Sequence, residues 1–287
     1  MDFIEVLKII LFGIIEGITE WLPVSSTGHL ILFEKFIHMN FSSAFLGMFE
    51  YVIQLAAILA VVVLFWNKIC PIGVKKTDEK KSLCWKKDSL TLWGKIILAC
   101  VPAVFALLID VLFLDKIKDS MLETAIIASM LIVYGVAFIL IEKFYTKNAT
   151  ITDVADISWK NAFFIGCFQI LACIPGTSRS GVTILGALLL CISRTAAAEF
   201  TFFLAIPTMV GTSGYKILDF FLDGNKLGSA EILALVIGCV VAFAVSMLAI
   251  KFLMNFVKKH NFKPFGWYRI GLGVVVLIVL VLIPSFA

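Results

Sequence analysis

Charged side chains are scarce in this sequence. Only 15% of the 287 residues are Asp, Glu, Lys or Arg, whereas 61% are hydrophobic. A soluble domain has about 25% charged residues, so that class is excluded and the composition indicates an integral membrane protein. The net charge is only +4, which fits membrane topology signals and argues against a nucleic-acid partner.

Cysteine pairs with metal-binding spacing are also missing. The seven cysteines form no C-x-x-C motif, and an odd number placed mostly in apolar runs argues against a disulfide framework. We expect them to be small, buried side chains. The first apolar run lacks a small-residue cleavage site and contains Glu16 and Glu20, so we do not expect it to be a removed signal peptide.

Long apolar runs are abundant. A helix needs about 20 apolar residues to cross a bilayer, and six runs reach this length: 45–66, 93–114, 122–141, 196–215, 231–250 and 266–284. Three other apolar pieces are too short to span alone: 29–37, 161–174 and 181–192. The sequence therefore predicts an all-α, polytopic membrane protein with six transmembrane helices.

Lysine and arginine predict the orientation of these helices. The loops richest in them should face the cytoplasm, and these are 67–92, 142–160 and 251–265. Residues 1–40 would then enter and leave the membrane from outside, and residues 161–192 from inside. We expect both segments to be re-entrant helical hairpins whose turns meet near the midplane. A simple membrane span by the first 22 residues is the alternative.

The turns of the two predicted hairpins are similar. Residues 22–26 read Leu-Pro-x-Ser-Ser, and residues 174–178 read Ile-Pro-x-Thr-Ser. The sequence therefore predicts one integral membrane domain, 1–287, built from inverted repeats at about 1–141 and 161–284. Broken helices in such repeats commonly form a binding site at the repeat interface.

The first turn is rich in carboxylates and hydroxyls. Glu16 and Glu20 are four residues apart and share a helix face. A bridging cation or a proton would relieve their repulsion, so a metal-binding pair, an acid/base pair and a wet helix end all stay open. Ser25, Ser26 and Thr27 lie where a second helix begins, and such a place either binds phosphate or is simply capped.

His29 lies three residues after Ser26, so both side chains can face the same side of the first helical turn. A histidine in an apolar stretch is more often a satisfied core residue. This one is the only histidine of three that lies near other polar groups. We therefore include it among the candidate catalytic residues.

Arg179 dominates the second turn. Its neighbours are hydroxyl residues and glycines: Gly176, Thr177, Ser178, Ser180, Gly181 and Thr183. A guanidinium surrounded by hydroxyls and amides is suited to bidentate binding of phosphate. A structural salt bridge to Glu16, Glu20 or Glu199 is a second interpretation that does not exclude the first.

Together the two segments are specific. Residues 16–29 read Glu-Gly-x-Thr-Glu-x-Leu-Pro-x-Ser-Ser-Thr-Gly-His, and residues 175–183 read Pro-Gly-x-Ser-Arg-Ser-Gly-x-Thr. They resemble the signatures of the bacterial undecaprenyl-diphosphate phosphatases, the bacitracin-resistance membrane phosphatases, and the resemblance covers essentially the whole chain. It implies removal of the terminal phosphate from undecaprenyl diphosphate, which recycles the lipid carrier of peptidoglycan synthesis. It also implies an outward-facing site in the bacterial plasma membrane, a divalent metal ion and bacitracin resistance on overproduction.

The motifs and the resemblance lead to one hypothesis for substrate binding. Arg179 would bind the diphosphate and stabilise charge in the transition state. The other predicted substrate-binding residues are Ser25, Thr27, Gly176, Thr177, Ser178, Ser180 and Thr183. Glu16 and Glu20 would hold a divalent cation, Mg²⁺ or Ca²⁺, that bridges phosphate oxygens.

For the chemical step, Ser26 acting as nucleophile with help from His29 is favoured over direct attack by His29. Glu20 is a further candidate catalytic residue, and attack by water stays open. The expected partners are the polyprenyl lipid and the bilayer, and a homodimer is left open. A transporter of polyprenyl phosphate lipid is the main rival, because inverted repeats with broken helices are typical of secondary transporters.

Overall fold

The structure is a computed structural model that describes residues 2–77, 80–109, 120–144 and 149–282. Its first half contains α1 (Phe3–Thr19), α2 (Ser26–Phe36), α3 (Ser43–Leu64), α4 (Trp66–Ile69), α5 (Lys87–Ile109) and α6 (Ser120–Phe144). Its second half contains α7 (Trp159–Gln169), α8 (Arg179–Leu189), α9 (Arg194–Leu222), α10 (Ser229–Lys259) and α11 (Lys263–Leu282). Two short 3₁₀ helices, η3 (Val154–Asp156) and η4 (Ile170–Cys173), flank α7.

The prediction of an all-α polytopic membrane protein is confirmed. Among the described residues, six helices are long and apolar enough to cross a bilayer, and they are α3, α5, α6, α9, α10 and α11. Each corresponds to one predicted span, although 110–114 and 283–284 lie outside the described residues. Large apolar side chains such as Leu248, which is 69% exposed, cover the outside of these helices. That surface suits lipid rather than water.

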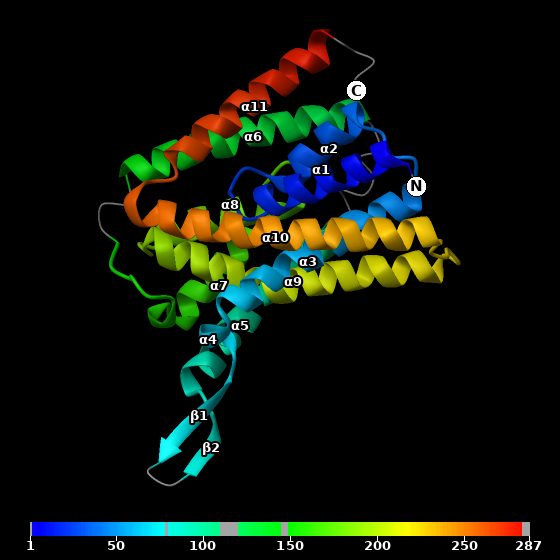
Figure 1. The fold of residues 1–287 in the computed structure, drawn as a ribbon. Helices are drawn as coiled ribbons and strands as arrows, with labels where there is room; N and C mark the ends of the chain where they lie inside the picture. The colour runs from blue at the N-terminus through cyan, green and yellow to red at the C-terminus, as the bar shows by residue number, and fades with distance from the viewer. Residues whose placement is uncertain (1, 78–79, 110–119, 145–148, 283–287) are drawn as a thin grey trace.

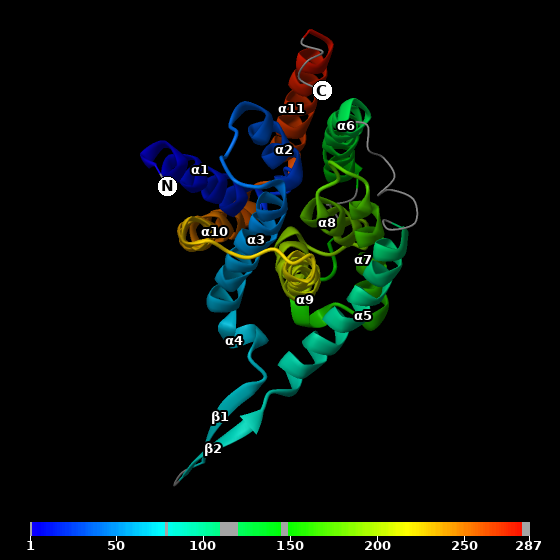
Figure 2. The ribbon, with the colours of Figure 1, turned by 90° about the vertical axis from the view of Figure 1, so that its right-hand side faces the viewer.

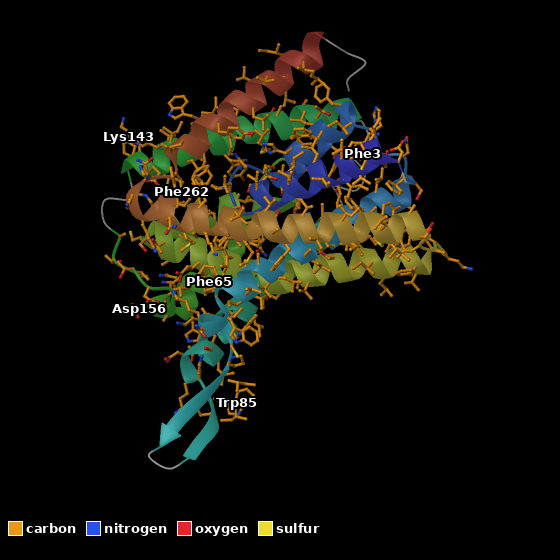
Figure 3. The ribbon with its side chains drawn as sticks, in the orientation of Figure 1. Phe3, Phe65, Trp85, Lys143, Asp156 and Phe262 are labelled. Carbon is orange, nitrogen blue, oxygen red and sulfur yellow. The ribbon has the colours of Figure 1, made fainter. Side chains whose placement is uncertain are left out.

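The ends of the long helices separate into two groups. Figure 3 shows Lys143, Asp156 and Phe262 at one end of the molecule and Phe3 at the other. The lysine-containing loops 142–160 and 251–265 therefore lie together, opposite the N-terminus. The connection between α9 and α10 lies at the N-terminal end (Figure 1). For the described parts of these two loops, the arrangement agrees with the relative positions that the lysine pattern predicts, whereas the third loop, 67–92, projects away from the helices (Figure 1).

Two helical hairpins lie among the long helices. The first is α1 followed by α2, and the second is α7 with η4 followed by α8 (Figure 1). A backbone bridge between Ile151 and Ile192 joins the two ends of the second hairpin. Re-entry of these hairpins into a bilayer, and the division into inverted repeats, stay predictions.

Helix α9 lies at the centre of the packing. It contacts α3, α5 and α8, as the view along the long helices shows (Figure 2). Helix α10 packs on α1 and α3, and α6 pairs with α11. The α6–α11 contact is close because a Cβ on Gly135 would lie 2.7 Å from the carbonyl oxygen of Gly266, which is the kind of small-residue packing that membrane helices use.

The lysine-rich loop 67–92 contains an element that the sequence did not predict. Strands β1 (Ile72–Thr77) and β2 (Lys80–Trp85) form an antiparallel pair in which Ile72 lies opposite Trp85. This hairpin projects away from the helices (Figure 1). It is the one departure from all-α structure in the part of the chain described here.

Candidate active site

The turns of the two hairpins meet in one pocket of about 220 Å³. The first turn contributes Glu20, Ser25 and Ser26, and the second contributes residues 177–180. Each turn ends in a serine that caps the next helix: Ser25 Oγ accepts from the amide of Gly28 at 3.3 Å, and Ser178 Oγ from that of Gly181 at 3.1 Å. These caps place Ser26 and Arg179 in the first turn of α2 and α8, facing the pocket.

Glu20 joins the two turns chemically. Its Oε1 accepts from Nη2 of Arg179 at 2.6 Å, and its Oε2 accepts from the hydroxyl of Ser26 at 2.7 Å. Both carboxylate oxygens are thus engaged by a cation on one side and a hydroxyl on the other. Arg179 also contacts the sulfur of Met209 through Nη2 at 3.2 Å. Its fork has five donors, so it can still bind phosphate oxygens.

Glu16 lies one turn before Glu20 on α1, and the amide of Glu20 donates to its carbonyl at 3.1 Å. The Glu16 side chain is completely buried, and neither carboxylate oxygen has a hydrogen-bond partner. A buried ionised carboxylate is costly unless a cation or a proton balances it. Glu16 therefore needs either a proton or a nearby cation to balance its charge.

The donor set fits a divalent cation only if the substrate completes it. No group of three His, Cys, Asp or Glu side chains within the described residues could hold a metal ion alone. Mg²⁺ is usually bound by one or two carboxylates together with substrate phosphates. Glu20 lines the pocket, whereas Glu16 is fully buried and does not line it, so the pair could hold a cation only together with substrate phosphates. Protonation of Glu16 would satisfy the same burial.

The structure does not bring His29 to Ser26. His29 is buried in α2, where Nδ1 donates to the carbonyl of Ser25 at 2.7 Å and Nε2 accepts from the hydroxyl of Tyr268 at 2.7 Å. The ring also stacks on Tyr268 with centroids 5.7 Å apart. Both nitrogens are used on the side of α2 that faces α11, so Glu20, and not His29, contacts the Ser26 hydroxyl.

The predicted binding residues do not all line the pocket. Thr177, Ser178 and Ser180 line the pocket, and Ser180 Oγ donates to the carbonyl of Glu20 at 3.3 Å. Thr183 is buried in α8 and accepts from Thr201 Oγ1 of α9 at 3.0 Å, so it links α8 to α9 and does not line the pocket. Gly176 forms the turn, and the side chain of Thr27 lies outside the described part of the structure.

Further pocket residues were missed from the sequence. They are polar or sulfur-containing side chains on α3 and α9: Tyr51, Gln54, Thr208, Met209 and Thr212. Their spacing was a usable signal, because Tyr51 and Gln54 are three apart, and Thr208 and Thr212 four apart, within apolar spans.

Arg269 of α11 was also missed, although it is the single charge inside the last apolar run. It is fully buried. Nη1 donates to the carbonyl of Pro23 at 3.3 Å, and Nη2 to that of Gly176 at 3.2 Å. One carbonyl belongs to each turn of the site.

A second, apolar pocket of about 380 Å³ adjoins the first. The two pockets share Arg179, Ala172, Thr208 and Thr212. The rest of its lining includes Cys100 and Val104 of α5 and Pro207 of α9. A charged pocket and an apolar pocket therefore meet at Arg179.

Comparisons with known proteins agree with this chemistry. The model of the family described as bacitracin resistance protein BacA matches residues 9–275. A protein of Enterococcus faecalis named undecaprenyl-diphosphatase is 56% identical over 280 residues, which are 97% of this chain and 98% of that protein. Proteins of the same name from Lachnoclostridium phytofermentans and Streptococcus pyogenes are each 53% identical, over 96% and 97% of this chain and 97% of their own length. The chain therefore belongs to the bacitracin resistance protein BacA family.

Proposed function

We propose that this protein hydrolyses undecaprenyl diphosphate to undecaprenyl phosphate and inorganic phosphate. Relatives that match nearly its whole length are named for that activity. The observation that carries the proposal is Glu20, which contacts the Arg179 guanidinium with one oxygen and the Ser26 hydroxyl with the other. The pocket therefore contains groups that can serve as base, nucleophile and anion-binding group, which supports the proposal.

Arg179 binds the terminal phosphate, assisted by the hydroxyls of Ser178 and Ser180. Glu20 takes the proton of Ser26 as its Oγ attacks the terminal phosphorus. The bond from that phosphorus to the bridging oxygen breaks, and undecaprenyl phosphate leaves. Water then hydrolyses the phosphoserine. Arg179 stabilises the charge that develops on the phosphoryl oxygens.

A divalent cation would be held by Glu16 and Glu20 and would neutralise phosphate charge when bound. The part of the carbon chain next to the diphosphate would occupy the apolar pocket, because that pocket begins at Arg179, where the phosphate is bound, and the rest of the chain would extend into the lipid. The lipid substrate and the multi-pass fold are consistent with each other. The site faces outward in the bacterial plasma membrane, which the lysine-rich loops at the opposite end support.

The direct test is phosphate release from undecaprenyl diphosphate by the purified protein in detergent, with and without a chelator. We expect release that falls when the chelator is added and returns with Mg²⁺ or Ca²⁺. The hairpins also favour a lipid carrier as a second candidate. Reconstituted vesicles separate the two, because lipid translocation without any phosphate release would contradict the enzymatic proposal.

A further inference from the structure

Arg269 is a buried charge that the proposed reaction does not use. It lies in α11, where the surrounding sequence is apolar, and it has no exposed surface. Its guanidinium carbon lies 5.7 Å from the centroid of the Tyr134 ring, and its Nε has no hydrogen-bond partner. Charges inside a membrane protein are costly and usually functional, so this arginine needs an explanation.

The two hydrogen bonds of Arg269 suggest what this buried charge does. The carbonyls of Pro23 and Gly176, at 3.3 and 3.2 Å, belong to turns that are more than 150 residues apart in the sequence. Pro23 precedes Ser26 by three residues, and Gly176 precedes Arg179 by three. A planar, rigid fork that donates to both carbonyls fixes the separation of the turns.

The reacting groups depend on that separation. The 2.6 Å contact between Glu20 and Arg179 crosses from one turn to the other. Small displacements of positioned groups can cost a hundredfold or so in rate. The surface of the turns that faces α11 is thus held by Arg269, while the opposite surface carries the chemistry.

We propose that Arg269 is a positioning residue that holds the two turns in register, so that Glu20 and Ser26 of one face Arg179 of the other. It acts through these residues and does not touch the substrate. The catalytic part of this inference rests on the proposed function, whereas the placement of the turns does not.

Arg269→Lys and Arg269→Gln test the proposal, because each leaves a head group that cannot reproduce the fork. We expect kcat for phosphate release to fall at least tenfold, with KM changed less than about threefold, because Arg179 still binds phosphate. The matched control is Arg194→Lys. Arg194 also makes two guanidinium hydrogen bonds, to Glu142 at 2.8 and 2.6 Å, but outside the pocket, so kcat should stay near the parent value.

Two further readouts separate positioning from general stability. Combined with Glu20→Asp, Arg269→Lys should cause less loss than the product of the single effects, because both disturb the same alignment. Amide hydrogen exchange should quicken in residues 21–26 and 174–179 and stay unchanged in α10. Additive losses, unchanged exchange in the turns, or failure of both variants to fold would overturn the proposal. If the parent releases no phosphate, the proposed function fails, and the exchange result still decides whether Arg269 holds the turns.

Discussion

The two hairpin turns share local features and carry opposite charges. Both contain a proline, a residue with positive φ and a serine that caps the following helix. The first turn carries Glu20 and the second carries Arg179, which meet at 2.6 Å. Each turn alone would leave a buried charge unbalanced. In the proposed mechanism the two turns therefore have different roles, one in proton transfer and one in anion binding.

The turns also differ in where positive φ occurs. In the second turn the residue is Gly176, directly after the proline, with φ of 82°, whereas in the first it is the capping Ser25, two residues after the proline, with φ of 76°. Glycine adopts this region without strain, and serine does not. The strained position directly precedes the proposed nucleophile, which agrees with the concentration of backbone strain at functional sites.

The prediction with the clearest outcome concerns the orientation of the chain in the membrane. This orientation decides from which side each hairpin would enter. In a cysteine-free background, a single cysteine at position 226 should react with an impermeant reagent on intact cells, and one at 259 should not. The reason is the positive-inside rule applied to the lysines near 259. Labelling of 259 from outside would reverse the orientation, and with it the face on which the site opens.

The largest catalytic effect is expected for Ser26→Ala. Removing the nucleophile should lower kcat by about a thousandfold or more with little change in KM, because Arg179 still binds the diphosphate. Phosphate release and substrate binding measure the two quantities separately. Ser129→Ala is the matched control, since that hydroxyl bonds only to the Ala125 carbonyl on an exposed part of α6. Retained turnover in Ser26→Ala would leave direct attack by water as the mechanism.

Arg179→Lys tests the anion-binding turn and should lower kcat/KM by about a hundredfold. The lysine keeps the charge but loses the planar fork that binds two phosphate oxygens at once. The measurement is the rate of phosphate release, with circular dichroism to confirm folding. Near-parent activity would mean that Arg179 serves only the ion pair with Glu20.

Glu16→Gln should have a smaller effect, about tenfold on the metal concentration that gives half-maximal activity. The carboxylate is buried without a hydrogen-bond partner, so its charge requires a cation or a proton. If it binds a cation, the titration with Mg²⁺ should shift to higher concentration. Superimposed titration curves would instead assign Glu16 a bound proton.

The smallest effect is expected from relaxing the first turn. Ser25→Gly removes the strained φ but also the cap, so stability should change by no more than about 1 kcal/mol. Gly176→Ala changes the positive-φ residue of the second turn and should cost about 3 kcal/mol or more, because the new Cβ would lie 2.5 Å from Cα of Ile127. Thermal unfolding in detergent compares the two. Equal losses would remove the distinction between the turns.

Hydropathy was sufficient to predict the six long helices, because lipid requires long apolar segments with internal hydrogen bonds. The two hairpins and most of the pocket followed from short apolar pieces interrupted by proline and polar residues.

Local spacing could not predict the direction of His29, which is decided by Tyr268 of α11, more than 200 residues later. The position of Arg269 against the two turns could not be predicted for the same reason. Its partners are distant backbone carbonyls, which no sequence pattern identifies. The strands of the 67–92 loop have no clear alternation of apolar and polar residues.

The ion pair between Glu20 and Arg179 also describes the resting enzyme. A buried charge is costly in a membrane protein unless an opposite charge balances it. Without a ligand, the carboxylate of Glu20 and the guanidinium of Arg179 balance each other. In the proposed mechanism an arriving diphosphate would bind the remaining donors of Arg179, which would weaken the pull of the guanidinium on Glu20 and make the carboxylate a better acceptor for the proton of Ser26. Binding of the substrate would thus activate Glu20 as a base, and Ser26 would stay protonated while no substrate is bound.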